Sequence, residues 1–323
     1  MKFIKGLISI LLLVFITSCI SYRYIDLQVL NPGSVKLPSD ITFHIINPQK
    51  IDSEHLLLLK DTTVNKLYYY KLLIHTFDST LKARFSESPM FENSRIVLQN
   101  ENDFQKEMAR KSSVEKTKHI LMTIQKMDVI EKKVQMAYDS WNYWYEGYYS
   151  FIYKFKMELQ NIGNEHYYDT AVLSDTITWT SSDYYRDNIL GSFPSLHETM
   201  EEIGGRVAQR YATKIAPFWN TEERVLFYSS NKYMRKGYNL FVANDLEGAI
   251  QSWKHLYEVG TSQLASGAAH NIGLAYEMLD DFENAELWLN NSIKLKFHFQ
   301  TDDYLDRIRE RKAGRKILDE EMK

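Results

Sequence analysis

The chain has 323 residues, of which 39 are basic and 42 acidic, so its formal net charge is −3 at pH 7. This length is enough for two domains with buried cores, and the near balance of charges excludes the strongly basic surface that nucleic-acid binding requires. Cys19 is the only cysteine, which excludes an intramolecular disulfide and a cysteine-ligated metal cluster.

The N-terminus has the layout of a secretory leader. Two lysines precede a short apolar run over residues 7–16, and small residues then lead into Cys19. The apolar run is shorter than the ~20 residues that a transmembrane helix needs. Residues 16–19 resemble a bacterial lipobox, which implies removal of residues 1–18 and lipidation of Cys19. A plain cleaved leader with an incidental cysteine is the alternative.

The residues after Cys19 indicate a destination. Ile20 follows directly, and no acidic cluster comes after it. By resemblance to other lipoproteins, the absence of an aspartate at this position implies release to the outer membrane, and the absence of an acidic cluster favours a periplasm-facing position. We therefore predict a lipid-anchored protein of the cell envelope.

The first domain, over residues 39–225, is expected to be mixed α/β. A turn-rich lead-in over residues 19–38 is followed by alternating apolar side chains at 41–46, which predict a strand. Apolar residues recur at three- and four-residue steps over 64–85, which predicts an amphipathic helix. A second short strand is predicted over 96–98. The succession of strand, helix and strand indicates an α/β opening.

The middle of the chain predicts antiparallel strands. Large apolar residues alternate with polar ones over 151–159, which is typical of a half-buried strand. Glu146-Gly147 and Gly163-Asn164 are expected to form hairpin turns. Residues 118–180 are therefore predicted to form an antiparallel meander.

A helix is expected to close the first domain near residue 225. Ser195 and Glu198 form an S-x-x-E capping box, and apolar residues repeat at helical spacing as far as Pro217. Gly204-Gly205 lies inside this pattern, where we expect close packing against the sheet. The helix should cover one face of that sheet.

The C-terminal part repeats itself at a period of 36 residues. Self-similarity close to ~34 residues is typical of tetratricopeptide repeats, and residues 231–297 resemble two of them. Glycines at matching positions permit close approach of the paired helices. The residues expected to pack the repeats together are Gly237, Ala249, Trp253, Gly273, Tyr276 and Ala285.

Two features depart from the tetratricopeptide pattern. The loop expected around residues 260–267 is long, and Thr261 and Phe297 stand where the repeats usually end in proline. Two repeats are also fewer than the three that a free-standing stack needs. Residues 302–323 predict a capping helix. The expected fold class is α+β, in which the mixed α/β domain with its antiparallel meander precedes an all-α, tetratricopeptide-like region over 226–323.

Several of these features together resemble one family. The lipobox, the α/β opening, the run of residues 212–219, the triplet Glu223-Arg224-Val225 and the run of residues 244–253 look like an uncharacterised family of Bacteroidetes lipoproteins with tetratricopeptide-like C-termini. The resemblance covers most of the chain after Cys19 and implies no activity. The α/β opening is also similar to the N-terminal domain of the envelope protein TolB.

Motifs for catalysis are missing from the sequence. The nine histidines are scattered, without the H-x-H or H-E-x-x-H spacing that presents ligands to zinc on one face. Neither a G-x-S-x-G elbow nor a glycine-rich phosphate loop occurs. We therefore predict no metal, no cofactor and no enzymatic activity.

An aromatic cluster surrounds the expected turn at Glu146-Gly147. Exposed rings there could stack on a sugar or on a partner side chain. The propensity of aromatic residues for paired strands explains the same enrichment without any function. The residues concerned are Trp141, Tyr143, Trp144, Tyr145 and Tyr148.

These observations predict a non-enzymatic, membrane-anchored envelope lipoprotein that acts as a protein-interaction or assembly module. The membrane contact is the lipid on Cys19, and a protein partner is expected to dock on the repeats over 231–297. Alternatively, the repeats only pack as a lid on the first domain. The alternative function is glycan binding by the aromatic hairpin at 141–149.

Overall fold

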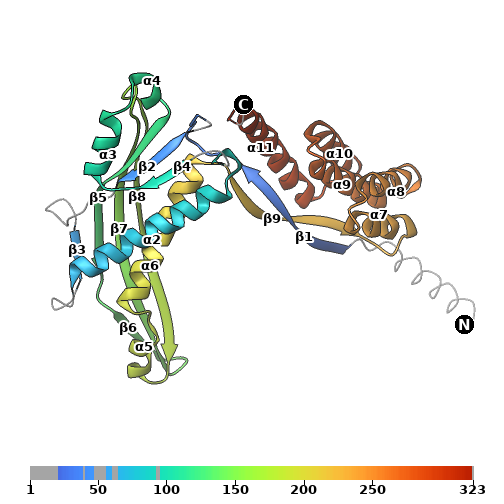
Figure 1. Ribbon diagram of the computed structural model, residues 1–323. Helices are drawn as coiled ribbons and strands as arrows, with labels where there is room; N and C mark the ends of the chain where they lie inside the picture. Colours follow the sequence, from blue (N-terminus) through green and yellow to red (C-terminus); the bar gives the residue numbers. More distant parts are fainter. Residues whose placement is uncertain (1–20, 39–40, 47–55, 60–64, 92–94, 322–323) are drawn as a thin grey trace, which may run out of the picture. The chain divides into compact units, whose positions relative to one another are not determined.

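The computed structural model describes residues 21–38, 41–46, 56–59, 65–91 and 95–321 (Figure 1). The expected leader and Cys19 lie outside these residues. The chain divides into two compact units, one made of residues 21–31 with 219–319 and the other built on residues 32–218. None of the helices in the described ranges is long and apolar enough to cross a membrane.

The unit of residues 32–218 is built on a seven-stranded mixed sheet. Its strands are β2 (Thr42–Ile46), β3 (Leu56–Leu58), β4 (Arg95–Leu98), β5 (His119–Glu131), β6 (Gln135–Asp139), β7 (Trp144–Asn161) and β8 (Tyr167–Asp183). The first half is parallel, with β2 between β4 and β5 and with β3 also paired to β5. The second half is antiparallel, because β7 pairs with β5, β6 and β8. The predicted opening strands and antiparallel pairing are confirmed.

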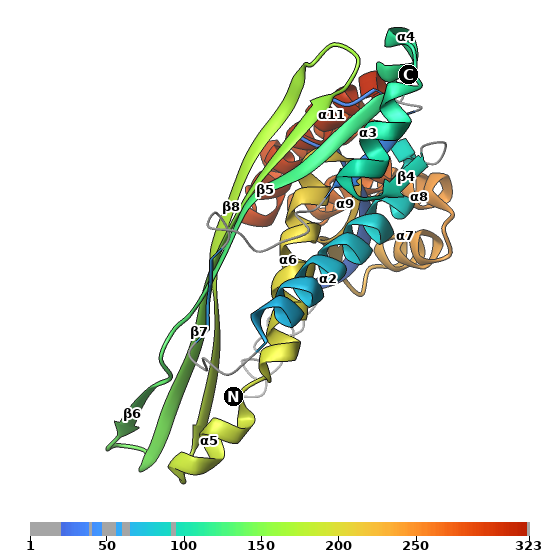
Figure 2. The same ribbon diagram turned by 60° about the vertical axis from the view of Figure 1, so that its left-hand side comes forward.

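Two long helices, α2 (Lys66–Glu87) and α6 (Leu196–Ile215), lie side by side along one face of this sheet (Figure 2). The predicted capping box at Ser195 and Glu198 is present at the start of α6. Apolar residues of both helices share a core with the strands, and the ring of Phe77 stacks 6.4 Å from that of Phe155. The helical spacing of apolar residues in the sequence therefore arises because each helix buries one face.

Gly204 lets α6 approach α2. A Cβ atom added at Gly204 would lie 2.6 Å from the carbonyl oxygen of Leu73, which is part of the α2 backbone. The expectation that this glycine packs against the sheet is wrong, because the atoms that approach it belong to the neighbouring helix α2. At the adjacent Gly205 the nearest atom to an added Cβ is 3.9 Å away, on Thr80.

The opposite face of the sheet carries a smaller core. Alternation along β2 directs Phe43 and Ile45 into the main core, whereas Ile46 packs with Phe104 and Met108 of α3 (Glu101–Ala109). His44 lies on this second face together with Ile46. The remaining short helices of the unit are η1 (Pro89–Phe91), α4 (Ser113–Lys116) and α5 (Arg186–Ser192).

The other unit is mainly helical. Its helices are α7 (Lys232–Val242), α8 (Leu246–Val259), α9 (Ser262–Met278), α10 (Phe282–Leu295) and α11 (Phe299–Glu321). The 36-residue period of the sequence recurs in its turns, since Asn244 and Asp280 adopt positive φ values of 62° and 57°. The next residues, Asp245 and Asp281, cap α8 and α10. The repeated residues thus build the same turn twice.

A two-stranded ribbon of β1 (Ser21–Asn31) and β9 (Phe218–Tyr228) completes this unit. Helix α9 satisfies the backbone of β9 with side chains. The amide of Asn271 accepts a hydrogen bond from the N–H of Phe227 and donates one to its carbonyl, both at 2.8 Å. A ring nitrogen of His270 lies 2.9 Å from the carbonyl oxygen of Val225. These buried polar side chains satisfy backbone groups of β9 that would otherwise need a third strand as their partner.

The ribbon corrects the expected domain organisation. Residues 21–31 of the expected lead-in over 19–38 form a strand, and this strand belongs to the helical unit. The second domain is therefore not all-α, and its boundary lies at residues 218 and 219 instead of 225 and 226. The reason is that β1 pairs with a strand about 200 residues away, which no local pattern shows.

Two expected connections are also wrong. Glu146-Gly147 lies inside β7, and the turn that joins β6 to β7 spans residues 140–143. Only residues 260 and 261 separate α8 from α9, so the long loop expected around 260–267 is instead the first part of α9. The predicted turn at Gly163-Asn164 is confirmed.

Candidate functional site

The hairpin between β6 and β7 carries the most exposed of the expected aromatic residues. Asp139 holds the turn by accepting hydrogen bonds from the backbone N–H groups of Trp141 at 2.9 Å and Asn142 at 3.2 Å. The side-chain amide of Asn142, together with these N–H groups, keeps the pKa of Asp139 below its ordinary value. Trp141 is 90% exposed and Tyr143 is 72% exposed.

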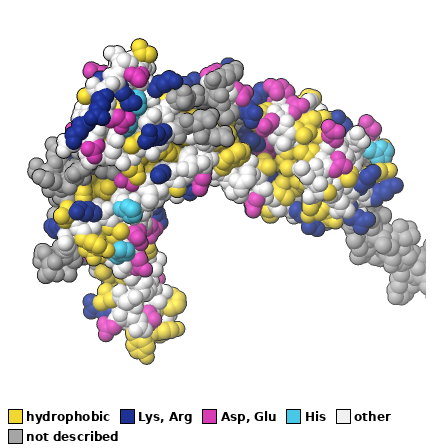
Figure 3. All heavy atoms as spheres, in the orientation of Figure 1, with side chains coloured by type: hydrophobic (Ala, Val, Ile, Leu, Met, Phe, Trp, Pro, Cys, Tyr) yellow, Lys and Arg dark blue, Asp and Glu magenta, His cyan; other side chains and the backbone are white. Residues whose placement is uncertain are grey.

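The other three aromatic residues are part of the strand. Trp144 and Tyr145 are half-buried, and Tyr148 donates a hydrogen bond from its hydroxyl to Glu146 at 2.7 Å. Trp141 and Tyr143 are therefore the members of this set that present most of their rings to solvent. Figure 3 shows hydrophobic side chains gathered at the end of the sheet that carries β6 and α5. Further exposed apolar residues there are Tyr138, Tyr184, Tyr185 and Leu190.

The expected repeat-packing residues lie between the helices of their unit. A Cβ atom added at Gly237 would lie 2.3 Å from the indole nitrogen of Trp253, and one at Gly273 would lie 2.8 Å from Leu289. Ala249, Trp253 and Ala285 are fully buried. Tyr276 is half-buried, and its hydroxyl accepts a hydrogen bond from Lys254 at 3.2 Å. A partner would therefore have to contact other residues of this unit.

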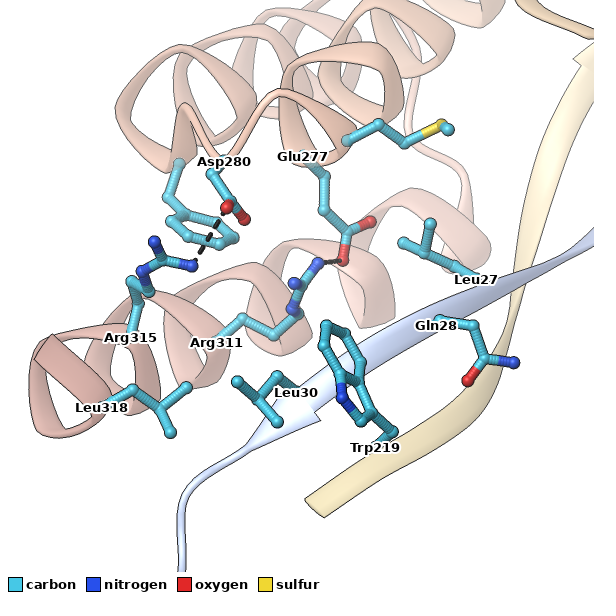
Figure 4. A pocket seen from close by; sticks show the side chains of 11 residues that line it. Leu27, Gln28, Leu30, Trp219, Glu277, Asp280, Arg311, Arg315 and Leu318 are labelled. Carbon is cyan, nitrogen blue, oxygen red and sulfur yellow. Dashed lines mark hydrogen bonds and ion pairs between the residues drawn. The ribbon is translucent and has the colours of Figure 1, made fainter. Parts of the chain in front are cut away.

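A cleft of about 230 Å³ opens within the helical unit, between the β1–β9 ribbon and helices α9, α10 and α11 (Figure 4). Trp219, which is 53% exposed, stands at its edge. Glu277 with Arg311 and Asp280 with Arg315 provide its charges. The apolar side chains that line it are Leu27, Leu30, Trp219, Met278, Phe282 and Leu318.

Glu277 is the buried centre of the charged part of this cleft. Arg224 donates to both of its oxygens at 2.9 and 3.1 Å, and Arg311 and the hydroxyl of Tyr304 donate to it as well. Burial alone would raise the pKa of Glu277, but the hydrogen bonds and charges of the arginines hold it below its ordinary value. Burial and Glu277 together raise the pKa of Tyr304. Glu277 is therefore an ionised anchor for both arginines.

Arg315 supplies the more accessible charge. It donates to Asp280 at 3.0 Å and to Asp319 at 3.1 Å, and its side chain is 42% exposed. Because both acids of the cleft are engaged by arginines, the arrangement suits holding a ligand more than moving a proton. An apolar side chain can pack on Trp219, and the outer edge of Arg315 can meet a carboxylate or a carbonyl oxygen.

Sequence reasoning missed this cleft because its lining comes from four separate parts of the chain. The segments are 27–30, 219, 277–282 and 311–318. None of these four segments stands out when the sequence is considered alone. In the sequence, Trp219 stands out only as the last residue of the run 212–219 that carries the family resemblance.

Solved structures show only loose likeness to the chain. One is a homologue of the neuraminyllactose-binding hemagglutinin from Helicobacter pylori, with a TM-score of 0.33 and 10% identity over 57% of this chain and 90% of that one. Another is a minor lipoprotein from Acinetobacter baumannii, with a TM-score of 0.26 and 8% identity over 55% and 98% of the two chains. Likeness at this level carries no functional argument. No curated protein matches the chain.

Family profiles match both units. Residues 235–310 match the domain of unknown function DUF6340, which lies within the helical unit. Residues 46–227 match the domain of unknown function DUF8603, a stretch that includes the whole sheet from β3 onward and more than half of the chain. By that match, the chain belongs to the DUF8603 family.

Proposed function

We propose that this protein is a non-enzymatic lipoprotein of the cell envelope that binds a segment of a protein partner in the cleft of its helical unit. The cleft carries the proposal, because it combines an exposed Trp219 with Arg311 and Arg315. Tryptophan and arginine are the residue types that contribute most at protein interfaces. The cleft is smaller than pockets for drug-sized ligands, at about 300–1,000 Å³, so we expect it to take one or two side chains of the partner.

The expected anchor fits this role. Only Ile20 separates Cys19 from β1, which begins at Ser21. Two residue steps span at most about 7 Å, so lipidation of Cys19 would hold the β1–β9 ribbon close to the bilayer. On the expected periplasmic side of the outer membrane, the cleft would meet partners at the membrane surface.

The helix pairs α7–α8 and α9–α10 are further proposed to be tetratricopeptide-like repeats, with α11 as their capping helix. Support comes from the equivalent turns at Asn244 and Asp280 and from the equivalent glycines, Gly237 and Gly273, beneath the second helix of each pair. Paired helices of this kind provide surfaces for peptide segments.

Site-specific photo-crosslinking in cells tests the cleft. A photoreactive phenylalanine analogue in place of Gln28, which lines the cleft, is expected to capture a protein partner. The same analogue at the exposed Val259, outside the lining, should not capture that partner. Trp219→Ala and Arg315→Glu should each reduce capture at position 28, whereas Trp141→Ala should leave it unchanged. Equal capture of the same proteins at positions 28 and 259 would contradict the docking role.

Glycan binding by the hairpin is a second candidate, which the exposure of Trp141 and Tyr143 favours. The face of an exposed ring can stack on the apolar face of a sugar. On a glycan array, binding by the protein should be lost in Trp141→Ala and retained in Trp219→Ala. A wild-type protein that binds no glycan on the array would remove this candidate.

A further inference from the structure

Two buried histidines meet on the face of the sheet that α3 covers. His44 lies in β2 and His119 is the first residue of β5, where the parallel register pairs it with Thr42. Residues two apart on a strand share a face, so the two imidazoles are diagonal neighbours. Nε2 of His44 lies 2.7 Å from Nδ1 of His119, and the two residues are 0% and 6% exposed.

Helix α3 brings a carboxylate to the same place. Phe104 packs on Ile46, and its ring lies 5.2 Å from that of His44, which fixes the helix over the histidines. Glu107 follows Phe104 by three residues and therefore lies on the same side of the helix. One ligand atom each from His44, His119 and Glu107 lies within 4.8 Å of the other two.

The surroundings prepare these groups to bind a cation. Burial lowers the pKa of His44 to about 4 and also lowers the pKa of His119. Neutral imidazole is the form that ligates metals. The side-chain amide of Gln99 lies 3.1 Å from Nδ1 of His44. With its oxygen turned toward Nδ1, this amide would accept the ring N–H and leave the lone pair of Nε2 for a metal.

A cavity of about 340 Å³ reaches the cluster from the surface. His119 forms part of its wall, which gives an ion a path to the imidazole and leaves room for a water molecule beside it. The charged residues around it are Arg95, Lys111, Glu115 and Lys118. Lys111 also lies 3.7 Å from Glu107, so the carboxylate already has one cationic neighbour.

We propose that His44, His119 and Glu107 form a binding site for Zn²⁺, with a water molecule from the cavity as the fourth ligand. Two histidines and one carboxylate with an open position are a ligand set that tetrahedral Zn²⁺ takes. Zn–N bonds of about 2.0–2.1 Å separate two ligand nitrogens by roughly 3.3 Å. The imidazoles therefore move apart by about half an ångström. The ring that donates its N–H to the other gives up this proton and takes one from solvent on its other nitrogen, so that both ligands stay neutral imidazoles when the two metal bonds form. The metal would join α3 to β2 and β5.

Lys111 distinguishes this site from a histidine pair that serves only packing. Its ammonium group beside Glu107 repels a cation, so Lys111→Met should tighten Zn²⁺ binding. Glu107→Gln replaces a carboxylate ligand by a weaker amide and should loosen binding by about 10-fold or more. If the histidines served only packing, Lys111→Met and Glu107→Gln would not change Zn²⁺ binding in opposite directions.

The test is a titration of the full chain after its leader with Zn²⁺ alone, after treatment with a chelator. Cys19 is replaced by serine so that its thiol cannot compete. We expect one Zn²⁺ per chain, bound with a dissociation constant below about 10 µM, and visible absorption typical of four-coordinate metal when Co²⁺ is used instead. His44→Gln should abolish this binding. Glu115→Gln, at the cavity wall, and His75→Gln, on the exposed side of α2, are the matched controls and should bind as the wild type does.

The same set of variants can overturn the proposal. Because His44 is fully buried, His44→Gln is first compared with the wild type by circular dichroism. If His44→Gln fails to fold, the test rests on Glu107→Gln and Lys111→Met, because both positions are half-exposed. These two variants are predicted to change the Zn²⁺ affinity in opposite directions. Absence of stoichiometric binding by the wild type would overturn the proposal, as would binding that Glu107→Gln and Lys111→Met leave unchanged.

Discussion

A single buried side chain, His270, sets part of the pH response of the helical unit. One of its ring nitrogens lies 2.9 Å from the carbonyl oxygen of Val225 and the other 3.0 Å from the hydroxyl of Thr301. A carbonyl can only accept, so Nε2 carries the proton and Nδ1 accepts from the threonine. Burial lowers the pKa of His270 to about 4. The neutral ring is therefore the form that the folded protein holds.

The free energy of unfolding should fall as the pH drops from about 6.5 to 4. In that window the unfolded chain binds a proton at residue 270 and the folded chain does not, which costs about 1 kcal/mol of stability per pH unit. Urea unfolding of His270→Gln should show a correspondingly smaller pH slope than the wild type. His75→Gln, at an exposed position, should keep the wild-type slope. Equal slopes for all three proteins would contradict this role of His270.

Glu277 responds to acid at lower pH. Its folded pKa lies below the ordinary value of 4.5, so its stabilising effect is complete above that pH and is lost as the pH falls through the folded value. At pH 7, Glu277→Gln leaves buried arginine charge without its partner and should lower the free energy of unfolding by about 3–5 kcal/mol. Asp303→Asn removes an exposed pair with Arg307 and should cost less than about 1 kcal/mol. Similar losses in the two variants would argue against the anchor role.

At the scale of elements, neighbouring glycines of α6 should respond in opposite ways to alanine. Gly204→Ala forces a methyl group against the α2 backbone and should lower the free energy of unfolding by about 1–3 kcal/mol. Gly205→Ala makes only an ordinary van der Waals contact, at 3.9 Å to Thr80, and should raise the free energy of unfolding by up to about 1 kcal/mol through helix propensity. Urea unfolding of both variants measures the difference, and shifts of the same sign would show that α6 does not depend on this close approach.

Single elements also show where sequence reasoning succeeds. The helix of α6 was predictable from its capping box and its apolar stripe, because both signals lie within the helix itself. The turn at Glu146-Gly147 was mispredicted, because a glycine inside β7 resembles a turn glycine when the neighbouring packing is unknown. In the fold, an added Cβ at Gly147 would lie 2.3 Å from Ile189 of α5, so this glycine serves packing.

At the scale of the whole molecule, β1 makes the helical unit discontinuous in sequence. Val29 is fully buried there, and Tyr22 lies 5.1 Å from the ring of Phe227. Deletion of residues 21–31 should therefore weaken amide hydrogen-exchange protection in α9 and β9, since both elements lose packing. Addition of a peptide of residues 21–31 should restore part of that protection. Unchanged amide hydrogen exchange in α9 and β9 after the deletion would mean that β1 does not contribute to the packing of these elements.

The sequence by itself determined the two long helices α2 and α6, the antiparallel pairing after residue 118 and the 36-residue recurrence of the helices, because capping, alternation and periodicity act between residues close in the chain. Only the tertiary structure decided which distant residues meet. His44 and His119 are 75 positions apart and share a hydrogen bond, and the cleft joins β1 to residues of α9 and α11. Such contacts depend on strand register and helix packing, and those arise when the whole core forms.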